Sequence, residues 1–205
     1  MELTEAIRQR RMVRSFAADP IDADLVERLL DDSLRGPTAG NTRGVAWVVL
    51  RGPDTAIYWE YATTAGWRSG SERYPGMSRA PVVALSLCSP TAYVERYGEP
   101  DKEGSGLGPS QHGDGTGSWP IPYWFGDAGC SIMLLLLGAT AAGLGAAFLG
   151  NFRGEGELLD ALGVPAGWRL FGAVLIGTPD GKDHPSESRG RRPTTGAGVV
   201  HRSRW

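Results

Sequence analysis

The chain has 205 residues, a net charge of −2 at pH 7 and a hydrophobic content of 41%. This length allows one domain with a substantial core. The near-neutral charge argues against nucleic acid or an anionic membrane as a partner. Two distant cysteines, Cys88 and Cys130, indicate neither a zinc site nor a disulfide framework. The N-terminus has no apolar signal core. We therefore expect a cytoplasmic protein that does not act on a membrane.

The first predicted element is a short helix over residues 3–11, and basic residues gather at its end. Arg10, Arg11 and Arg14 fall within five consecutive positions. Guanidinium groups are planar, permanently charged and well suited to holding a phosphate. The simpler interpretation is that cations at a helix C-terminus complement the helix dipole. A second basic cluster near the other end of the chain favours the phosphate, which needs donors from several segments.

A second helix is predicted to begin at Asp22 or Asp24 and to end before Gly36. A turn of small residues follows, with the sequence Pro37-Thr38-Ala39-Gly40-Asn41. Glycine lets a backbone approach a flat ring closely, and asparagine adds an amide. The same turn also fits an ordinary connector between a helix and a strand. Together with the arginines, it indicates a phosphorylated, ring-bearing cofactor.

The remaining regular elements alternate irregularly along the chain. A buried strand is predicted at residues 45–50, and further strands at 81–88, 146–149 and 169–177. Helices are predicted over residues 54–67 and 155–162. This irregular order favours an α+β sandwich of sheet and helices over a repeating βαβ array.

Residues 98–118 are rich in Gly, Pro, Ser and Asp, and we expect a flexible loop with a functional role or disorder. The aromatic run at 119–125 is a candidate for covering a substrate. Asp127 is predicted to cap a buried, apolar helix that runs to about Ala142. The tail, at about 179–205, is predicted to be extended and basic.

Taken in order, these motifs resemble the FMN-dependent nitroreductase family along nearly the whole chain. The matching features are Arg-Arg-x-x-Arg-x-Phe, Pro-Thr-Ala-Gly-Asn, Asp127-Ala128-Gly129 before an apolar helix, Gly143-Leu144-Gly145 after it, and an arginine-rich tail. The resemblance implies one α+β domain over 1–205, with a central, mostly antiparallel sheet flanked by helices. It also implies an intertwined homodimer with two FMN molecules in the interface, each contacted by both subunits.

The resemblance further implies where FMN binds. The arginines of both clusters would hold the phosphate, the 37–41 turn would line the flavin from the partner subunit, and the strand near residue 149 would approach the reactive edge of the ring. Arg43 is expected near the flavin-facing side of the turn. The implied cofactor-binding residues are Arg10, Arg11, Met12, Arg14, Pro37, Thr38, Ala39, Gly40, Asn41, Arg43, Phe148, Leu149, Gly150, Arg189 and Arg191.

The implied activity needs no catalytic side chain and no metal, because the flavin carries the chemistry. NADH or NADPH would reduce the flavin, and a small-molecule acceptor such as a nitro compound, quinone or enone would reoxidise it in a ping-pong cycle. The chain has Met12, Arg43 and Gly150 where many or some members have Ser, Gln and Glu. These differences concern the substrate and the classical nitroarene activity rather than FMN binding. The alternatives are an FMN-dependent dehydrogenase or oxidase of a specialised substrate, a flavin-sequestering protein without turnover, and a non-flavin interaction module whose arginines are surface charge.

Overall fold

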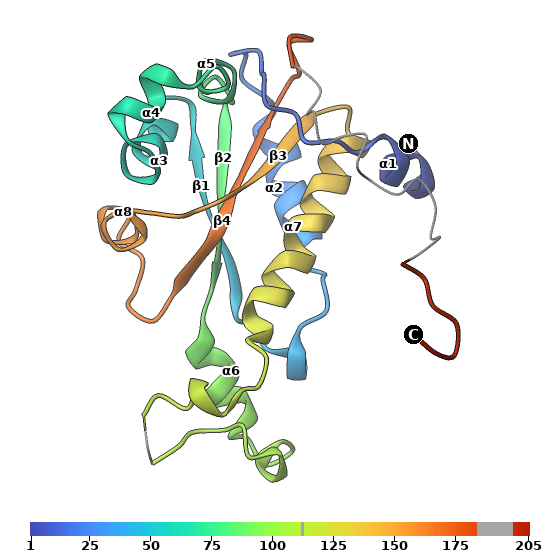
Figure 1. Cartoon of the computed structure of the whole chain (residues 1–205), viewed down its shortest axis with the longest axis vertical. Helices are drawn as coiled ribbons and strands as arrows, with labels where there is room; N and C mark the ends of the chain where they lie inside the picture. Colours follow the sequence, from blue (N-terminus) through green and yellow to red (C-terminus); the bar gives the residue numbers. More distant parts are fainter. Residues whose placement is uncertain (112, 184–198) are drawn as a thin grey trace.

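The structure is a computed structural model that describes residues 1–111, 113–183 and 199–205 (Figure 1). Its centre is an antiparallel sheet in the order β1-β2-β4-β3. The strands are β1 (Val45–Arg51), β2 (Val82–Cys88), β3 (Gly145–Gly150) and β4 (Arg169–Gly177). The prediction of an α+β fold with a mostly antiparallel sheet is confirmed.

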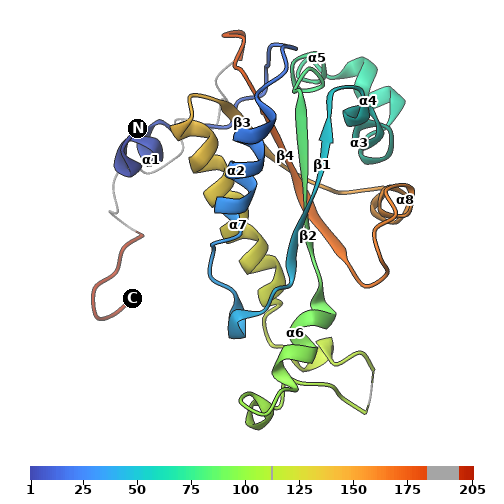
Figure 2. The same cartoon turned by 180° about the vertical axis from the view of Figure 1, so that it is seen from behind.

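The core lies on both faces of the sheet, and β2 is buried at every position. Two helices, α2 (Ala23–Ser33) and α7 (Tyr123–Ala141), pack together on one face. The opposite face is covered by α3 (Thr55–Ala62) and α8 (Glu155–Ala161), as Figure 2 shows from behind. Because helices cover both faces of the sheet, the central strands β2 and β4 are apolar runs without alternation.

Local capping chemistry sets several helix ends. The Asp22 carboxylate accepts a 2.8 Å hydrogen bond from the Leu25 N–H, so Asp22 caps α2 rather than Asp24. The predicted helix over 54–67 is in fact two helices, α3 and α4 (Ala65–Gly70), because the backbone is extended at Thr63 and Thr64.

Three short helices complete the described fold. Helix α1 (Leu3–Gln9) lies beside α7, and α5 (Tyr74–Met77) precedes β2. Helix α6 (Pro90–Tyr97) begins after Ser89, whose hydroxyl accepts from the Ala92 N–H. The sequence patterns did not predict α6, because its start is encoded only by the Ser-Pro cap.

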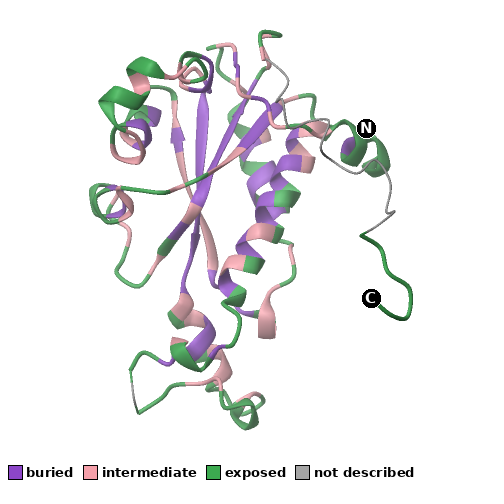
Figure 3. Ribbon diagram, in the orientation of Figure 1, coloured by how far each residue is buried: buried purple, intermediate pink, exposed green. Residues whose placement is uncertain are grey.

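Helix α7 begins at Tyr123, so the prediction that Asp127 caps it is wrong. The end of the aromatic run, Tyr123-Trp124-Phe125, forms the start of the helix, and Asp127 lies in its second turn. Figure 3 shows α7 buried toward the sheet, while Met133 and Leu134 are exposed. By length and composition, α7 is the single helix in the described ranges that is able to cross a membrane. A buried core helix meets the same criterion of length and composition, so this alone does not indicate a membrane-spanning helix.

The N-terminal segment at residues 10–16 crosses the molecule beside the free edge of β3. The Val13 N–H donates a 2.9 Å hydrogen bond to the Ala146 carbonyl, and Met12 forms a parallel bridge with Ala146. Phe16 then pairs with Pro179, where the chain leaves β4. These contacts place the first basic segment between β3 and the beginning of the tail.

Candidate functional site

The 10–16 segment and the end of β3 form one side of the candidate site. The Phe148 N–H lies 3.3 Å from the Met12 sulfur, which acts as a weak acceptor. Met12 therefore joins the arginine segment to the strand that contains Phe148, Leu149 and Gly150. The structure thus brings together two sets of predicted site residues that are far apart in the sequence.

The arginines of this segment are not equivalent. Nη1 of Arg10 is buried and has no hydrogen-bond partner in the part of the chain that the structure describes. Arg14 is half-buried, whereas Arg11 is exposed. Burial, followed by the charge of Arg73, lowers the pKa of Arg14, while Asp183 acts in the opposite direction. Leaving a buried donor without a partner costs about 1–3 kcal/mol of stability. An anion bound beside Arg10 and Arg14 would accept from this donor and remove the cost.

Arg73 is a candidate site residue that sequence reasoning missed. It precedes α5, and α5 packs directly on the 10–16 segment. A Cβ on Gly76 would lie 2.7 Å from the Arg14 carbonyl oxygen, so glycine permits this close approach. Because α5 is far from residue 14 in the sequence, only the tertiary packing shows that the charges of Arg14 and Arg73 interact.

The tail begins at the same place. The Asp180 carboxylate accepts hydrogen bonds from the Ser15 hydroxyl at 2.9 Å and from Nη2 of Arg79 at 2.7 Å. Nε of Arg79 also donates to the Phe16 carbonyl. Arg189 and Arg191 lie outside the described residues, so their predicted contact with the phosphate stays a prediction.

The backbone of the 37–41 turn is left-handed at two residues, a conformation that lets the main chain approach a ring closely. Gly40 and Asn41 both have positive φ angles, 65° and 56°. At Gly40, a Cβ would lie 2.7 Å from the Tyr97 ring, so both the conformation and the space favour glycine. Asn41 and Arg43 are exposed, and no hydrogen bond ties their side chains to the described part of the fold.

Two charged side chains fix this turn. The Ala39 N–H donates a 2.8 Å hydrogen bond to Oδ2 of Asp127, and Nε of Arg96 donates to the Gly40 carbonyl at 2.8 Å. Arg96 also pairs with Asp101, at 2.6 and 2.7 Å. The turn is therefore held by α7 on one side and by α6 on the other, which leaves its exposed side chains facing outward.

Within one chain, the turn and the arginine segment lie at opposite ends of α7 (Figures 1 and 2). The turn contacts α7 at Asp127, whereas α1 lies beside the C-terminal end of α7, as Figure 1 shows. From Asp127 to the end of α7 the helix rises about 20 Å. A single copy of the chain therefore does not bring the two predicted halves of the site together.

The aromatic run at 119–125 has a mainly structural role. Trp119 and Trp124 are buried and pack edge-on against Tyr93. The indole N–H of Trp119 also donates to the Leu107 carbonyl, which ties down the 98–118 loop. Tyr123 is 44% exposed. The expectation that the run covers a substrate thus fails for the two tryptophans, because they fill a core.

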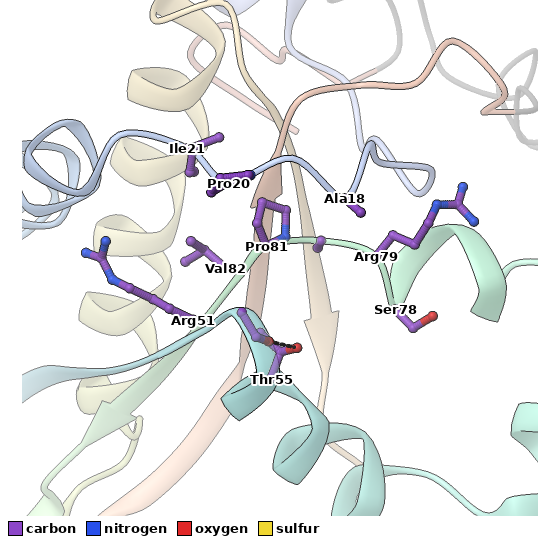
Figure 4. A pocket seen from close by; sticks show the side chains of 11 residues that line it. Ala18, Pro20, Ile21, Arg51, Thr55, Ser78, Arg79, Pro81 and Val82 are labelled. Carbon is purple, nitrogen blue, oxygen red and sulfur yellow. Dashed lines mark hydrogen bonds between the residues drawn. The ribbon is translucent and has the colours of Figure 1, made fainter.

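A cavity of about 530 Å³ lies elsewhere, at the end of the sheet where the chain enters α2, α3 and β2 (Figure 4). Two arginines line it, but Arg51 pairs with Glu27 and Arg79 pairs with Asp180. None of the predicted cofactor-binding residues lines this cavity. We therefore place the candidate site at the 10–16 segment and β3.

Solved structures share this fold over nearly the whole chain. A nitroreductase family protein from Clostridium difficile has a TM-score of 0.70 and 14% identity, with 100% of both chains covered. A putative nitroreductase from Desulfovibrio desulfuricans, solved in complex with FMN, has a TM-score of 0.66 and 21% identity over 98% of both chains. The chain is thus an α+β protein of the nitroreductase fold.

The sequence comparison agrees with the fold. A model described as "Nitroreductase family" matches residues 7–74 and 110–178, which is more than half of the chain. The chain belongs to the nitroreductase family. It is also similar to 5,6-dimethylbenzimidazole synthase of Rhodobacter capsulatus, with 28% identity over 88% of this chain and 85% of the relative.

Proposed function

We propose that the protein is an FMN-dependent oxidoreductase that takes electrons from NADH or NADPH and passes them to an electron-poor organic acceptor. The acceptor class comprises nitro compounds, quinones and enones, and the cycle is ping-pong. The observation that carries this proposal is the cluster of arginines in the 10–16 segment beside β3, which suits an anion. There, Nη1 of Arg10 is buried without a hydrogen-bond partner among the described residues, and Arg14 lies near a second cation, Arg73.

The residues of this cluster fit FMN. Arg10 and Arg14 would hold the phosphate, with Arg11 at the rim and Arg189 and Arg191 added from the tail. Terminal phosphates are well matched by guanidinium groups, whose paired N–H donors fit two oxygens at once. The ring would then extend along Phe148, Leu149 and Gly150, whose strand is already joined to the 10–16 segment through Met12.

We further propose a homodimer, in which the 37–41 turn of one subunit completes the site of the other. The separation of the two half-sites along α7 supports this. Large apolar side chains stay exposed on α1 and α7, namely Leu3, Ile7, Met133 and Leu134. A second copy of the chain would bury them. We also propose a single cytoplasmic domain over 1–205 with neither nucleic acid nor membrane as partner.

In this mechanism the bound flavin supplies hydride and electron transfer, and the chain supplies position and charge. Arg14 and Arg73 would place positive charge beside the phosphate. A cation or amide donor near the ring would stabilise the negative charge of the reduced cofactor, by the same electrostatic principle as an oxyanion hole. Gly40 and Asn41 offer backbone and amide groups to a flat ring. The exposed Arg43 would contact the cofactor or an anionic group of the acceptor.

A second candidate is an FMN-dependent dehydrogenation or oxidation of a specialised substrate. The similarity to a relative named as a synthase, 5,6-dimethylbenzimidazole synthase, supports this candidate. Gly150, where some nitroreductases have glutamate, leaves the end of β3 without a carboxylate. The third alternative, a flavin-sequestering protein without turnover, keeps the same cofactor residues.

Purified protein separates these functions. We expect a yellow protein that releases FMN on heating, identified by mass, and that bleaches with NADH or NADPH under anaerobic conditions. Bound FMN that resists bleaching would favour the specialised oxidation or sequestration. Recovery of FAD, or of no flavin, would refute the proposed function.

A further inference from the structure

The Asp127 carboxylate is buried at the base of the 37–41 turn and is 8% exposed. Its Oδ2 accepts two hydrogen bonds of 2.8 Å, from the Ala39 N–H and from the Tyr93 hydroxyl. Tyr93 is itself fully buried. This carboxylate therefore fixes one peptide group of the turn, and α7 and α6 meet through it.

No described cation forms an ion pair with Asp127. The other charged side chain that holds the turn is Arg96 of α6, which donates to the Gly40 carbonyl. The guanidinium of Arg96 is already paired with Asp101 and Glu99, at 2.6 and 2.9 Å. Within the described residues, the hydrogen bonds to the Asp127 carboxylate thus come from neutral donors, and no ion pair offsets a charge on it. A buried charge of this kind is felt over several ångströms, because the surrounding dielectric is low.

We propose that Asp127 is a positioning residue that has two effects on the bound flavin: it holds the flavin-facing turn in place, and its charge makes the flavin harder to reduce. This inference rests on the proposed function. The charge argument follows from the sign alone. Reduction of flavin adds negative charge, and a buried carboxylate behind the turn disfavours that charge. The neutral hydroxyl of Tyr93 moderates the effect by donating to the carboxylate.

The experiment compares three variants by the midpoint potential of bound FMN and by the dissociation constant of oxidised FMN. Asp127→Asn keeps an oxygen acceptor for the Ala39 N–H but removes the charge, so the potential should rise while the FMN affinity changes little. Asp127→Ala also removes the hydrogen bonds and should weaken FMN binding by about tenfold or more. Tyr93→Phe leaves the charge with one donor fewer, so the potential should fall.

Asp22→Ala is the matched control, because it removes a capping aspartate that lies on α2, away from the turn. It should destabilise the protein without moving the potential. If Asp127→Asn binds FMN with an unchanged or lowered potential, the inference is overturned and the proposed function stands. If the asparagine variant does not fold, an unchanged or raised potential in Tyr93→Phe overturns the inference. If the wild-type protein binds no FMN, both the inference and the proposed function fail.

Discussion

The Tyr93 hydroxyl donates a 2.8 Å hydrogen bond to the Asp127 carboxylate, and this bond joins α6 to α7 inside an aromatic cluster. Burial, followed by the hydrogen bond to Asp127, raises the pKa of Tyr93 far above its ordinary value, so the hydroxyl stays a neutral donor. The bond explains why Asp127 is needed within α7 rather than at its cap. It also makes the cluster of Tyr93, Trp119 and Trp124 a structural support for the 37–41 turn.

Tyr93→Phe should lower the free energy of unfolding by about 1–3 kcal/mol, because it leaves a buried carboxylate with one donor fewer. Urea denaturation of the apoprotein measures this. Tyr123→Phe is the control, since Tyr123 packs on the same Trp119 ring as Tyr93 but is exposed. It should change stability by less than about 0.5 kcal/mol. Equal effects of the two substitutions would contradict the assigned role of the bond.

Arg14→Ala should weaken FMN binding by at least about tenfold, because a charge-assisted hydrogen bond contributes roughly 1.5–3 kcal/mol. The apoprotein should not lose comparable stability, since Arg14 is half-buried near another cation, Arg73. Fluorescence titration with FMN measures the affinity. Arg8→Ala, an exposed arginine on α1, should bind FMN like the wild type. Arg191→Ala should behave like Arg14→Ala, and wild-type affinity in both would refute the phosphate assignment.

Arg43→Gln tests the exposed arginine after the turn. If the guanidinium faces the flavin, its loss should lower the midpoint potential, because positive charge stabilises the reduced form. If it selects anionic acceptors, the substitution should shift preference toward neutral ones. Potentiometry and an acceptor panel of matched charged and neutral quinones measure the two effects. An unchanged potential with an unchanged acceptor profile would leave Arg43 as a surface residue.

Acid pH should reduce the contribution of Asp180, at the beginning of the tail, to the free energy of unfolding. A backbone hydrogen bond from Lys182 lowers the pKa of Asp180 against the opposing effect of desolvation, and hydrogen bonds from Ser15 and Arg79 lower it further. A carboxyl whose pKa is lower in the folded state stabilises the fold above its unfolded pKa of about 3.9. That contribution is lost as the pH falls through the lower, folded value. Asp180→Asn should therefore show a weaker dependence of unfolding free energy on acid pH. A slope identical to the wild type would argue against the bond.

The homodimer is tested by light scattering. We expect a mass of twice the chain, with FMN retained, because each turn would complete the partner's site. Replacing the exposed Met133 and Leu134 on α7 by Glu should give monomers that also lose FMN, since the half-sites would separate. A stable wild-type monomer with bound flavin would contradict the shared site.

Much of the fold was predictable from the sequence because its signals are local. Runs of β-branched and aliphatic residues predicted all four strands, and Asp22 and Gly143 marked helix ends through capping and a positive φ. The order of the arginine, turn and glycine motifs was enough to indicate the family. These features depend on residues that are only a few positions apart, so they can be predicted from the sequence alone.

The tertiary structure decided the rest, because it depends on residues that meet only after folding. Sequence spacing assigned Asp127 to a helix cap. Its partners, the Ala39 N–H and the Tyr93 hydroxyl, come from two other segments. Without this carboxylate, both buried donors would be left unpaired. Arg73 had no motif at all, and it became a candidate only because α5 packs on the arginine segment. Electrostatic and hydrogen-bonding partners are chosen by distance in space, which the order of residues along the chain does not specify.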